Sequence, residues 1–263
     1  MLIRQLWTDN PLRNFNYLVA CPDSGEALAI DPLDFKLCLE TAKAAGWEIT
    51  QVLNTHHHGD HTGGNSGIIK ATGAKLLAHK DAGNSISGID TGLSANDVIK
   101  IGKHIRLRCL DTPGHTMSHI CALSDTDEPV LFSGDTLFNA GAGNCTNGGH
   151  PVAMFNTYET QLSKLNPEIR LYPGHDYLQN NLGFTLDREP NNAVAQELLN
   201  SLGNYDPANA IVTTLAEELE INTFFRLEQP SLVEKLQTDC PEVGNSPSRE
   251  TVFLKLRELR NSW

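Results

Sequence analysis

The stretch Thr55-His56-His57-His58-Gly59-Asp60-His61 decides how the rest of the chain is interpreted. From residue 56 to residue 61 it presents potential ligands in the order His-x-His-x-Asp-His. Neutral imidazole and carboxylate are ligands that borderline divalent metals accept. The run 48–53 before it alternates and predicts a strand, and 62–65 after it opens a helical stretch through about Thr72. The cluster is therefore expected at the end of a strand, where a rigid backbone brings side chains together.

Three further strand-like runs end in a glycine that is followed by a ligand. The runs 105–110, 129–132 and 169–172 lead into Pro113-Gly114-His115-Thr116, Ser133-Gly134-Asp135-Thr136 and Pro173-Gly174-His175-Asp176. Together with the first stretch they supply five histidines and two aspartates, enough for two metal ions that share one carboxylate. Structural zinc sites are usually closed with about four ligands and are rich in cysteine, so this set favours a catalytic centre.

This ordered ligand set resembles that of the metallo-β-lactamase superfamily and, within it, of the hydroxyacylglutathione hydrolases (glyoxalase II). Other stretches similar to that family's signatures are 133–138, 174–177, 180–182 and the tail 256–263. The resemblance runs from Ile30-Asp31-Pro32 to the C-terminus. It implies an α+β fold. A four-layer αβ/βα metallo-β-lactamase sandwich over residues 1–176 would carry the catalytic site, and a smaller helical domain over 177–263 would bind substrate.

The resemblance also assigns the ligands residue by residue. One metal ion is expected on His56, His58 and His115, the second on Asp60, His61 and His175, and Asp135 would bridge them together with a hydroxide. Zinc is expected, with iron or manganese as alternatives, because the His/Asp set accommodates all three. Two such ions lower the pKa of a shared water and stabilise the oxyanion formed by attack on a carbonyl. Asp60 and Asp135 are therefore the catalytic candidates.

The substrate implied by the resemblance is a thioester, S-D-lactoylglutathione or a related S-2-hydroxyacyl glutathione, split to a 2-hydroxy acid and a free thiol. Substrate contacts are expected from Tyr177, Asn144, Thr146, Arg257 and Arg260. The chain departs from the family at Asn144 and Thr146, where a basic residue and a tyrosine are usual. Loss of a charge-assisted hydrogen bond costs about 1.5–3 kcal/mol. A thioester of a thiol other than glutathione therefore remains an alternative substrate.

Two alternative activities remain at this stage. One is hydrolysis of a lactone or of a thioester with a different carrier. The other is a persulfide dioxygenase with mononuclear iron, whose two histidines and one aspartate are a subset of the ligands present. The full second-metal set and the long helical C-terminus count against the dioxygenase.

Simpler interpretations apply to several residues. Arg257 and Arg260, at i, i+3 spacing, would without the resemblance indicate a solvated helix face. Cys145 is framed by no nucleophile motif. The remaining histidines are expected to be spacers, packed or exposed side chains; they are His57, His79, His104, His119 and His150. For His150 a substrate contact is also considered.

Composition limits the partners. The formal net charge is −12, from 20 basic and 32 acidic residues, which argues against nucleic acid because phosphate contacts need clustered Lys and Arg. No apolar run reaches the ~20 residues that cross a bilayer. The N-terminus lacks the shape of a signal peptide, so a cytoplasmic location and no membrane partner are expected. A small-molecule substrate and a monomer or small homo-oligomer complete the prediction.

The distribution of patterns predicts helices after about residue 191. The runs 193–199, 231–237 and 249–259 have helical spacing, and Pro190-Asn191-Asn192 is a plausible cap for the first. The interval 206–229 has few strand signals. The six cysteines are scattered and are expected to be reduced, mostly as small core residues.

Overall fold

The computed structural model describes residues 1–124 and 126–263. They form two compact units. Unit 1 comprises Met1–Thr112, Ser118–Gly134 and Tyr172–Asp176, and unit 2 comprises Pro113–Met117, Asp135–Leu171 and Tyr177–Trp263. The domain boundary expected between residues 176 and 177 stays a prediction. Within the described residues, no helix is both long enough and apolar enough to span a membrane.

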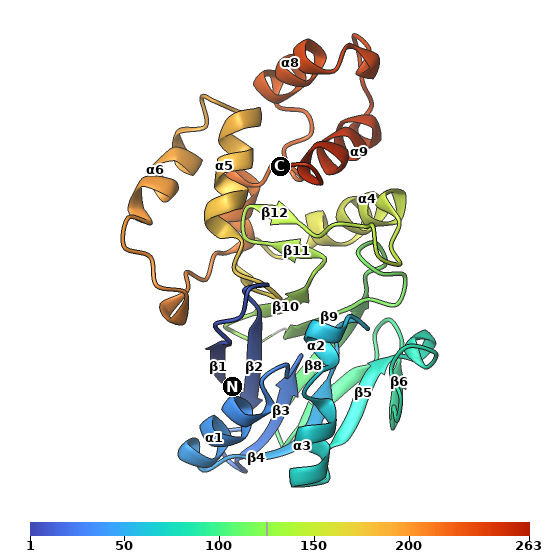
Figure 1. Cartoon of the computed structure of the whole chain (residues 1–263), viewed down its shortest axis with the longest axis vertical. Coiled ribbons are helices and arrows are strands. Elements are labelled where there is room, and N and C mark those ends of the chain that lie inside the picture. The colour runs from blue at the N-terminus through green and yellow to red at the C-terminus, as the bar shows by residue number, and fades with distance from the viewer. Residues whose placement is uncertain (125) are drawn as a thin grey trace. The chain divides into compact units, whose positions relative to one another are not determined.

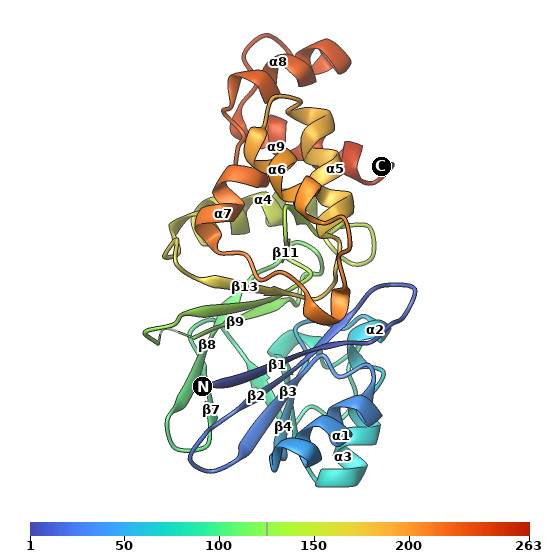
Figure 2. The same cartoon turned by 90° about the vertical axis from the view of Figure 1, so that its left-hand side faces the viewer.

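The first sheet of unit 1 has six strands in sequence order. They are β1(Leu2–Trp7), β2(Phe15–Ala20), β3(Glu26–Ile30), β4(Glu48–Leu53), β5(Lys75–His79) and β6(Thr91–Leu93). The first three strands pair antiparallel, whereas β3 to β6 pair parallel. Parallel strands need crossover connections, and here these include α1(Phe35–Ala45), α2(Gly59–Thr62) and α3(Asn65–Thr72). Figure 2 shows α1 and α3 covering one face of this sheet.

The second sheet has the order β13-β10-β9-β8-β7. Its strands are β7(Val98–Ile101), β8(Ile105–Asp111), β9(Ile120–Ser124), β10(Val130–Gly134) and β13(Arg170–Pro173), and the division between the units falls inside β13. The ring of Tyr17 in β2 packs 5.3 Å from that of Phe132 in β10 and 5.7 Å from that of Tyr172. These aromatic contacts join the two sheets within unit 1.

Unit 2 consists of a short hairpin and mostly helices (Figure 1). The hairpin is β11(Leu137–Phe138) and β12(Gly141–Ala142). The helices are α4(Pro151–Thr160), α5(Leu178–Arg188), α6(Ala193–Ser201), α7(Leu215–Ile221), α8(Pro230–Asp239) and α9(Arg249–Arg260). An aromatic core ties α4 to α9, because the Tyr158 and Phe224 rings each lie 5.2 Å from the ring of Phe253.

Short 3₁₀ helices also occur in the described part of the chain; they are η1(Lys80–Ala82), η2(Leu162–Lys164), η3(Pro207–Asn209) and η4(Pro241–Val243). The three helices expected after residue 191 are present as α6, α8 and α9. The expected cap is present as well, since the side chain of Asn192 accepts a hydrogen bond of 3.0 Å from the Ala195 N–H. The helices α5 and α7 were not predicted from the sequence. A reciprocal capping box between Thr214 and Glu217 begins α7, and this signal is readable in the sequence.

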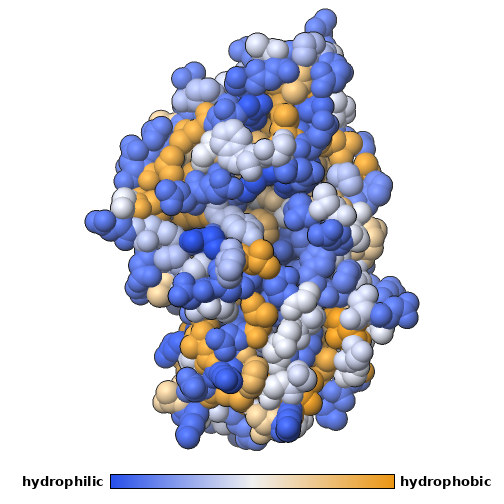
Figure 3. Space-filling model, viewed as in Figure 1, coloured by the Kyte–Doolittle hydropathy of each residue, from blue (hydrophilic) through white to orange (hydrophobic). Residues whose placement is uncertain are grey.

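The surface is mixed in hydropathy, and the cysteines are reduced and mostly buried, as expected from the sequence. Figure 3 shows hydrophobic residues interspersed with hydrophilic ones on the face in view. All six cysteines are free thiols, and all but Cys145 are buried. Burial raises the pKa of the half-buried Cys145 thiol to about 11, which makes it a poor nucleophile at neutral pH.

Candidate functional site

The histidine-rich stretch follows β4, where the neighbouring parallel strand β3 also ends. This pairing sets Asp31 beside Thr55. The carboxylate of Asp31 accepts hydrogen bonds from the Thr55 N–H at 2.8 Å and from the Thr55 hydroxyl at 2.6 Å. The backbone of Gly134 approaches Thr55 so closely that a Cβ at this position would lie 2.6 Å from Thr55 Oγ1. The backbone that leads into the histidines is therefore fixed from three strands.

Asp60, His61 and His175 form a compact donor group in unit 1, with ligand atoms within 4.8 Å of one another. The Nε2 atoms of His61 and His175 are 3.2 Å apart, and Asp60 Oδ2 lies 3.4 and 3.5 Å from them. His61 Nδ1 is 3.0 Å from Asp31 Oδ2, and His175 Nδ1 is 2.7 Å from the Leu12 carbonyl oxygen. These acceptors hold the Nδ1–H tautomer, so both Nε2 lone pairs face Asp60.

This arrangement fits a divalent cation. Two imidazole lone pairs at 3.2 Å repel each other unless a proton or a cation lies between them. A carboxylate at the same point adds the charge that a metal ion would balance. Asp60 is itself oriented, because Asn14 donates from Nδ2 to Asp60 Oδ2 at 2.9 Å. Neither Asp31 nor Asn14 was among the expected site residues.

His56 and His58 form a second pair in unit 1. His56 Nε2 lies 3.1 Å from His58 Nδ1, and His56 Nδ1 lies 3.0 Å from the Thr55 hydroxyl oxygen. The ring of His119 stacks on that of His56, with centroids 5.2 Å apart, and its Nδ1 lies 2.9 Å from Thr112 Oγ1. His119 is thus a packed and hydrogen-bonded histidine, as expected.

The last two expected ligands, His115 and Asp135, belong to unit 2. His115 Nε2 lies 3.4 Å from Asp135 Oδ2, and His115 Nδ1 lies 2.6 Å from the carbonyl oxygen of Asn144. The tautomer is again the one that directs Nε2 toward a carboxylate. The structure therefore groups the expected ligands as five in unit 1 and two in unit 2. Their assignment to individual ions stays a prediction.

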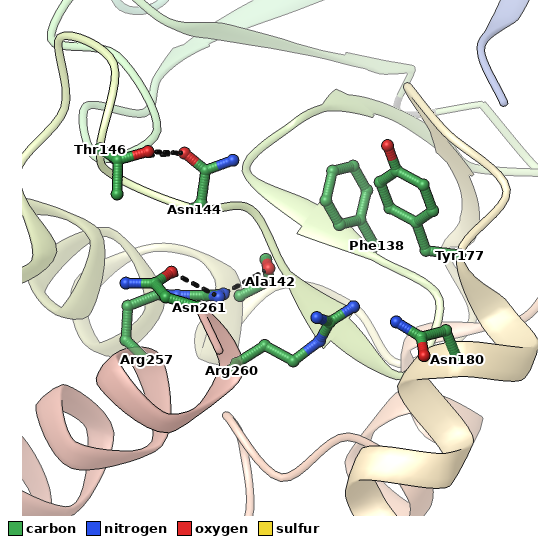
Figure 4. Close-up of a pocket in the computed structure, with 9 residues that line it drawn as sticks. All are labelled: Phe138, Ala142, Asn144, Thr146, Tyr177, Asn180, Arg257, Arg260 and Asn261. Atoms are coloured by element: carbon green, nitrogen blue, oxygen red, sulfur yellow. Dashed lines mark hydrogen bonds between the residues drawn. The ribbon is translucent and has the colours of Figure 1, made fainter. Parts of the chain in front are cut away.

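Unit 2 also contains a cavity of about 380 Å³. Figure 4 shows its lining residues, which are Phe138, Ala142, Asn144, Thr146, Tyr177, Asn180, Arg257, Arg260 and Asn261. The five residues expected to contact substrate are all among them. We call this cavity the unit 2 pocket. Phe138, Ala142, Asn180 and Asn261 also line it and were not predicted from the sequence.

The two arginines of the pocket differ. Arg257 is 4% exposed, so the alternative of a solvated helix face is wrong for it. Its Nη1 donates to the carbonyl oxygens of Ala142 and Gly143 at 2.7 and 3.0 Å, and its Nη2 donates to Asn261 Oδ1 at 3.1 Å. Burial lowers the Arg257 pKa to about 10, so the guanidinium stays charged at neutral pH. Arg257 therefore holds the wall of the pocket.

Arg260 is half-buried and donates from Nη2 and Nε to Asn181 Oδ1 at 3.0 and 3.3 Å. Figure 4 shows its guanidinium extending into the pocket between Asn180 and Ala142. Burial lowers its pKa as well. Arg260 is thus the arginine whose guanidinium faces the cavity.

Neutral groups line the rest of the pocket. The N–H and hydroxyl of Thr146 both donate to Asn144 Oδ1, at 3.1 and 2.9 Å. This fixes the Asn144 amide with its nitrogen directed away from Thr146 (Figure 4). The ring of Tyr177 packs edge-on against Phe138, with centroids 5.3 Å apart. The loop therefore offers dipoles, and the formal positive charge of the pocket comes from α9.

Other histidines have structural or surface positions. His57 Nδ1 lies 3.4 Å from the Ser118 hydroxyl oxygen. His79 is buried, and its Nδ1 accepts a hydrogen bond from the Asp81 N–H at 3.1 Å. His104 and His150 are exposed, and His150 precedes α4. The surface interpretation of His150 is therefore the one that its exposure supports.

Comparison with known proteins identifies the family. Residues 21–175 match the model of the metallo-beta-lactamase superfamily, and residues 176–263 match that of the hydroxyacylglutathione hydrolase C-terminus. Proteins named hydroxyacylglutathione hydrolase from Nitrosococcus oceani and from a Polaromonas species are 60% and 59% identical to this chain, each over 100% of both chains.

A solved structure shows the same fold. The crystal structure of ETHE1 from Myxococcus xanthus matches with a TM-score of 0.69 at 22% identity, over 100% of this chain and 99% of that chain. The expected fold class is thus confirmed: mixed α/β sheets of the metallo-β-lactamase type, with a helical C-terminal region. The chain belongs to the metallo-beta-lactamase superfamily and, within it, to the hydroxyacylglutathione hydrolases.

Proposed function

We propose that this protein is a metal-dependent hydrolase that splits a glutathione thioester, S-D-lactoylglutathione or a related S-2-hydroxyacyl glutathione, into a 2-hydroxy acid and glutathione. The observation that carries the proposal is the 59–60% identity over the full length to proteins named hydroxyacylglutathione hydrolase. The same relatives count against the persulfide dioxygenase considered above. The cytoplasmic location and the monomer or small homo-oligomer stay predictions from the sequence.

Divalent metal binding through His/Asp clusters is implied by the superfamily, and the finer proposal is two ions per chain, zinc before iron or manganese. The proposed ligands are His56, His58, Asp60, His61, His115, Asp135 and His175. Support comes from the donor group of Asp60, His61 and His175 and from the acceptors that fix the tautomers of His61, His175 and His115. When bound, a pair of divalent ions supplies a water acidified toward neutral pH and positive charge near a developing oxyanion.

The side chains of the site have separate tasks in this proposal. Asp31 holds His61 by its Nδ1–H, and the Leu12 carbonyl does the same for His175. Asp60 and Asp135 supply the negative charge that retains the ions. These groups are preorganised, so the reaction does not have to wait for side-chain rearrangement.

The unit 2 pocket is proposed to bind the thiol part of the substrate. A glutathione moiety carries carboxylates and peptide groups. The half-buried guanidinium of Arg260 suits a carboxylate, and the Asn144 amide and the hydroxyls of Thr146 and Tyr177 suit peptide groups. Arg257 adds positive charge from behind the wall while its N–H groups hold Ala142 and Gly143.

One specific observation favours a second candidate. Asn144 and Thr146 are neutral where the family usually has a basic residue and a tyrosine, so the pocket offers less positive charge to a dicarboxylate tripeptide. A thioester of a different thiol, with the same acyl group, is the alternative that this loop supports.

Steady-state hydrolysis of S-D-lactoylglutathione, with metal content assayed on the same sample, tests the proposal. A coenzyme A thioester of the same acid is the matched comparison. Faster turnover of the glutathione ester at low substrate concentration is expected. Preference for the coenzyme A ester would move the carrier away from glutathione. Protein that contains two ions and leaves both esters intact would refute thioester hydrolysis.

A further inference from the structure

Glu218 in α7 is a fully buried carboxylate in unit 2, with 0% exposure. Its Oε2 accepts hydrogen bonds from the Ala140 N–H at 2.8 Å and from Asn222 Nδ2 at 3.0 Å, and its Oε1 accepts one from the Thr213 hydroxyl at 2.7 Å. All three donors are uncharged. Burial of a carboxylate costs free energy that such hydrogen bonds must offset. A buried carboxylate at this position therefore suggests a specific role.

The carboxylate holds the turn of the β11–β12 hairpin. Ala140 in this turn has φ +54°, a left-handed conformation that residues with a side chain rarely adopt, and its N–H is bound to Glu218. Asn139 donates from Nδ2 to Thr213 Oγ1 at 2.7 Å. Asn222 donates from Nδ2 to the Gly141 carbonyl oxygen at 3.1 Å. Thr213, Glu218 and Asn222 therefore hold the whole turn. They bind Asn139, Ala140 and Gly141, respectively.

The same hairpin forms part of the pocket wall. Phe138 ends β11, Ala142 ends β12, and both line the unit 2 pocket. The Asn139 carbonyl oxygen accepts a hydrogen bond from Asn181 Nδ2 at 2.8 Å, and Asn181 Oδ1 accepts from Arg260 Nη2 at 3.0 Å. A continuous series of hydrogen bonds thus runs from Glu218 through the turn to the arginine that extends into the pocket.

We infer that Glu218 is a positioning residue: its ionised carboxylate holds the β11–β12 turn so that Phe138, Ala142 and Arg260 keep the geometry that binds the thiol part of the substrate. Glu218 acts through the turn, not by contact with the ligand. The inference rests on the proposed function, because it takes this ligand to be glutathione.

Protonation gives the inference a pH signature. Burial raises the pKa of Glu218 to about 7, the adjacent Glu217 adds to the rise, and the three hydrogen bonds oppose it. A proton on either oxygen would face a donor, so protonation must break or reverse at least one of these bonds. Affinity for the thiol part should therefore fall as the pH falls through about 7.

The contribution of Glu218 to folding stability should depend on pH in the opposite direction to ligand affinity. The folded-state pKa lies above the ordinary value of 4.5, so this group's contribution to stability is present below about 4.5 and is lost as the pH rises through about 7. The ionised form that shapes the pocket is thus the form that burial penalises. A residue that only supported the fold would affect stability without this opposite change in KM.

The test compares Glu218→Gln with Glu220→Gln, an exposed glutamate two residues along the same helix. KM, kcat and the calorimetric Kd of glutathione are measured between about pH 6 and pH 8.5, on either side of the Glu218 pKa of about 7. For Glu218→Gln at alkaline pH we expect KM and Kd to rise about tenfold, which is the factor for about 1.4 kcal/mol, while kcat is retained. The pH dependence of both constants should be weaker than in the wild type, and Glu220→Gln should match the wild type.

Backbone hydrogen exchange at Ala140 provides a readout that is independent of ligand and metal. Faster exchange in Glu218→Gln than in Glu220→Gln supports the inference, and equal exchange overturns it. If Glu218→Gln does not fold, Thr213→Val removes the hydroxyl between Asn139 and Glu218 and should raise KM in the same direction.

The outcomes separate the two claims. Wild-type protein that neither binds glutathione nor cleaves its thioester overturns the proposed function, and this inference falls with it. Wild-type turnover combined with an unchanged KM in Glu218→Gln overturns the inference alone.

Discussion

The donor group of unit 1 and the pocket of unit 2 are built by different means. In the donor group each histidine is aimed by one acceptor, as Asp31 aims His61 and the Leu12 carbonyl aims His175. In the pocket, by contrast, Arg257 donates hydrogen bonds to the carbonyl oxygens of Ala142 and Gly143, whereas the guanidinium of Arg260 extends into the cavity. A metal site needs a few directional donors, whereas a pocket needs a backbone held in one shape.

The largest effect is expected from Asp135→Ala. Loss of the carboxylate proposed to be shared by both ions should prevent binuclear loading and lower kcat/KM by roughly 10³-fold or more, since one lost oxyanion donor alone costs about 10²–10³. Metal content by mass spectrometry and thioester hydrolysis are measured on one sample. Two ions in the purified variant would sink the bridging assignment.

A second prediction separates the two arginines of the pocket. Arg257→Met leaves the Ala142 and Gly143 carbonyls without their donor and should lower the free energy of unfolding by about 1–3 kcal/mol. Arg260→Met, at the half-buried position, is the matched control and should change stability less and KM more. Urea unfolding measures the free energy of unfolding of both variants, and steady-state kinetics measures their KM. Equal stability losses would remove the distinction between a wall arginine and a ligand arginine.

Asp31→Asn tests the corresponding support in unit 1. An amide supplies one acceptor oxygen where Asp31 supplies two, for Thr55 and for His61, so the His61 tautomer is no longer held. Metal affinity should fall about 10–100-fold, the usual cost of losing such an outer partner. Chelator competition measures it.

The control for Asp31→Asn is Asp34→Asn, which weakens only the N-cap hydrogen bond that the Asp34 carboxylate accepts from the Leu37 N–H of α1. This variant should lose some stability and keep its metal. If both variants bind metal equally, Asp31 has no role in aiming His61.

The smallest effect is expected from Asn144→Lys. The substitution adds a positive charge to the edge of the pocket, where Asn144 and Thr146 now offer only dipoles. KM for the glutathione thioester should fall by about 3- to 10-fold. This gain is smaller than the usual 1.5–3 kcal/mol of a charge-assisted hydrogen bond because the site is exposed. The gain should shrink at high salt. An unchanged KM at low salt would mean that this loop does not meet a carboxylate.

The proposed metal ligands could be predicted from the sequence because their signals are local. The order His-x-His-x-Asp-His, the strand before it and the glycine turns before His115, Asp135 and His175 lie within short stretches. Asp31 was missed as a support, because its contact with His61 depends on parallel pairing of β3 and β4 across 30 residues of chain. The helix α5 was missed because Asn180, Asn181 and Gly183 weaken its helical pattern and packing overrides propensity.

By itself the sequence predicted the proposed metal ligands and their order, and it determined the helices α6, α8 and α9 and the family. Only the tertiary structure decided which charges are buried. Glu217 and Glu218 are adjacent and chemically identical, yet one caps α7 at the surface and the other is enclosed beneath the hairpin turn. Arg257 and Arg260 differ in the same way. Burial depends on which distant segments pack against a residue, and neither residue type nor local spacing carries that information.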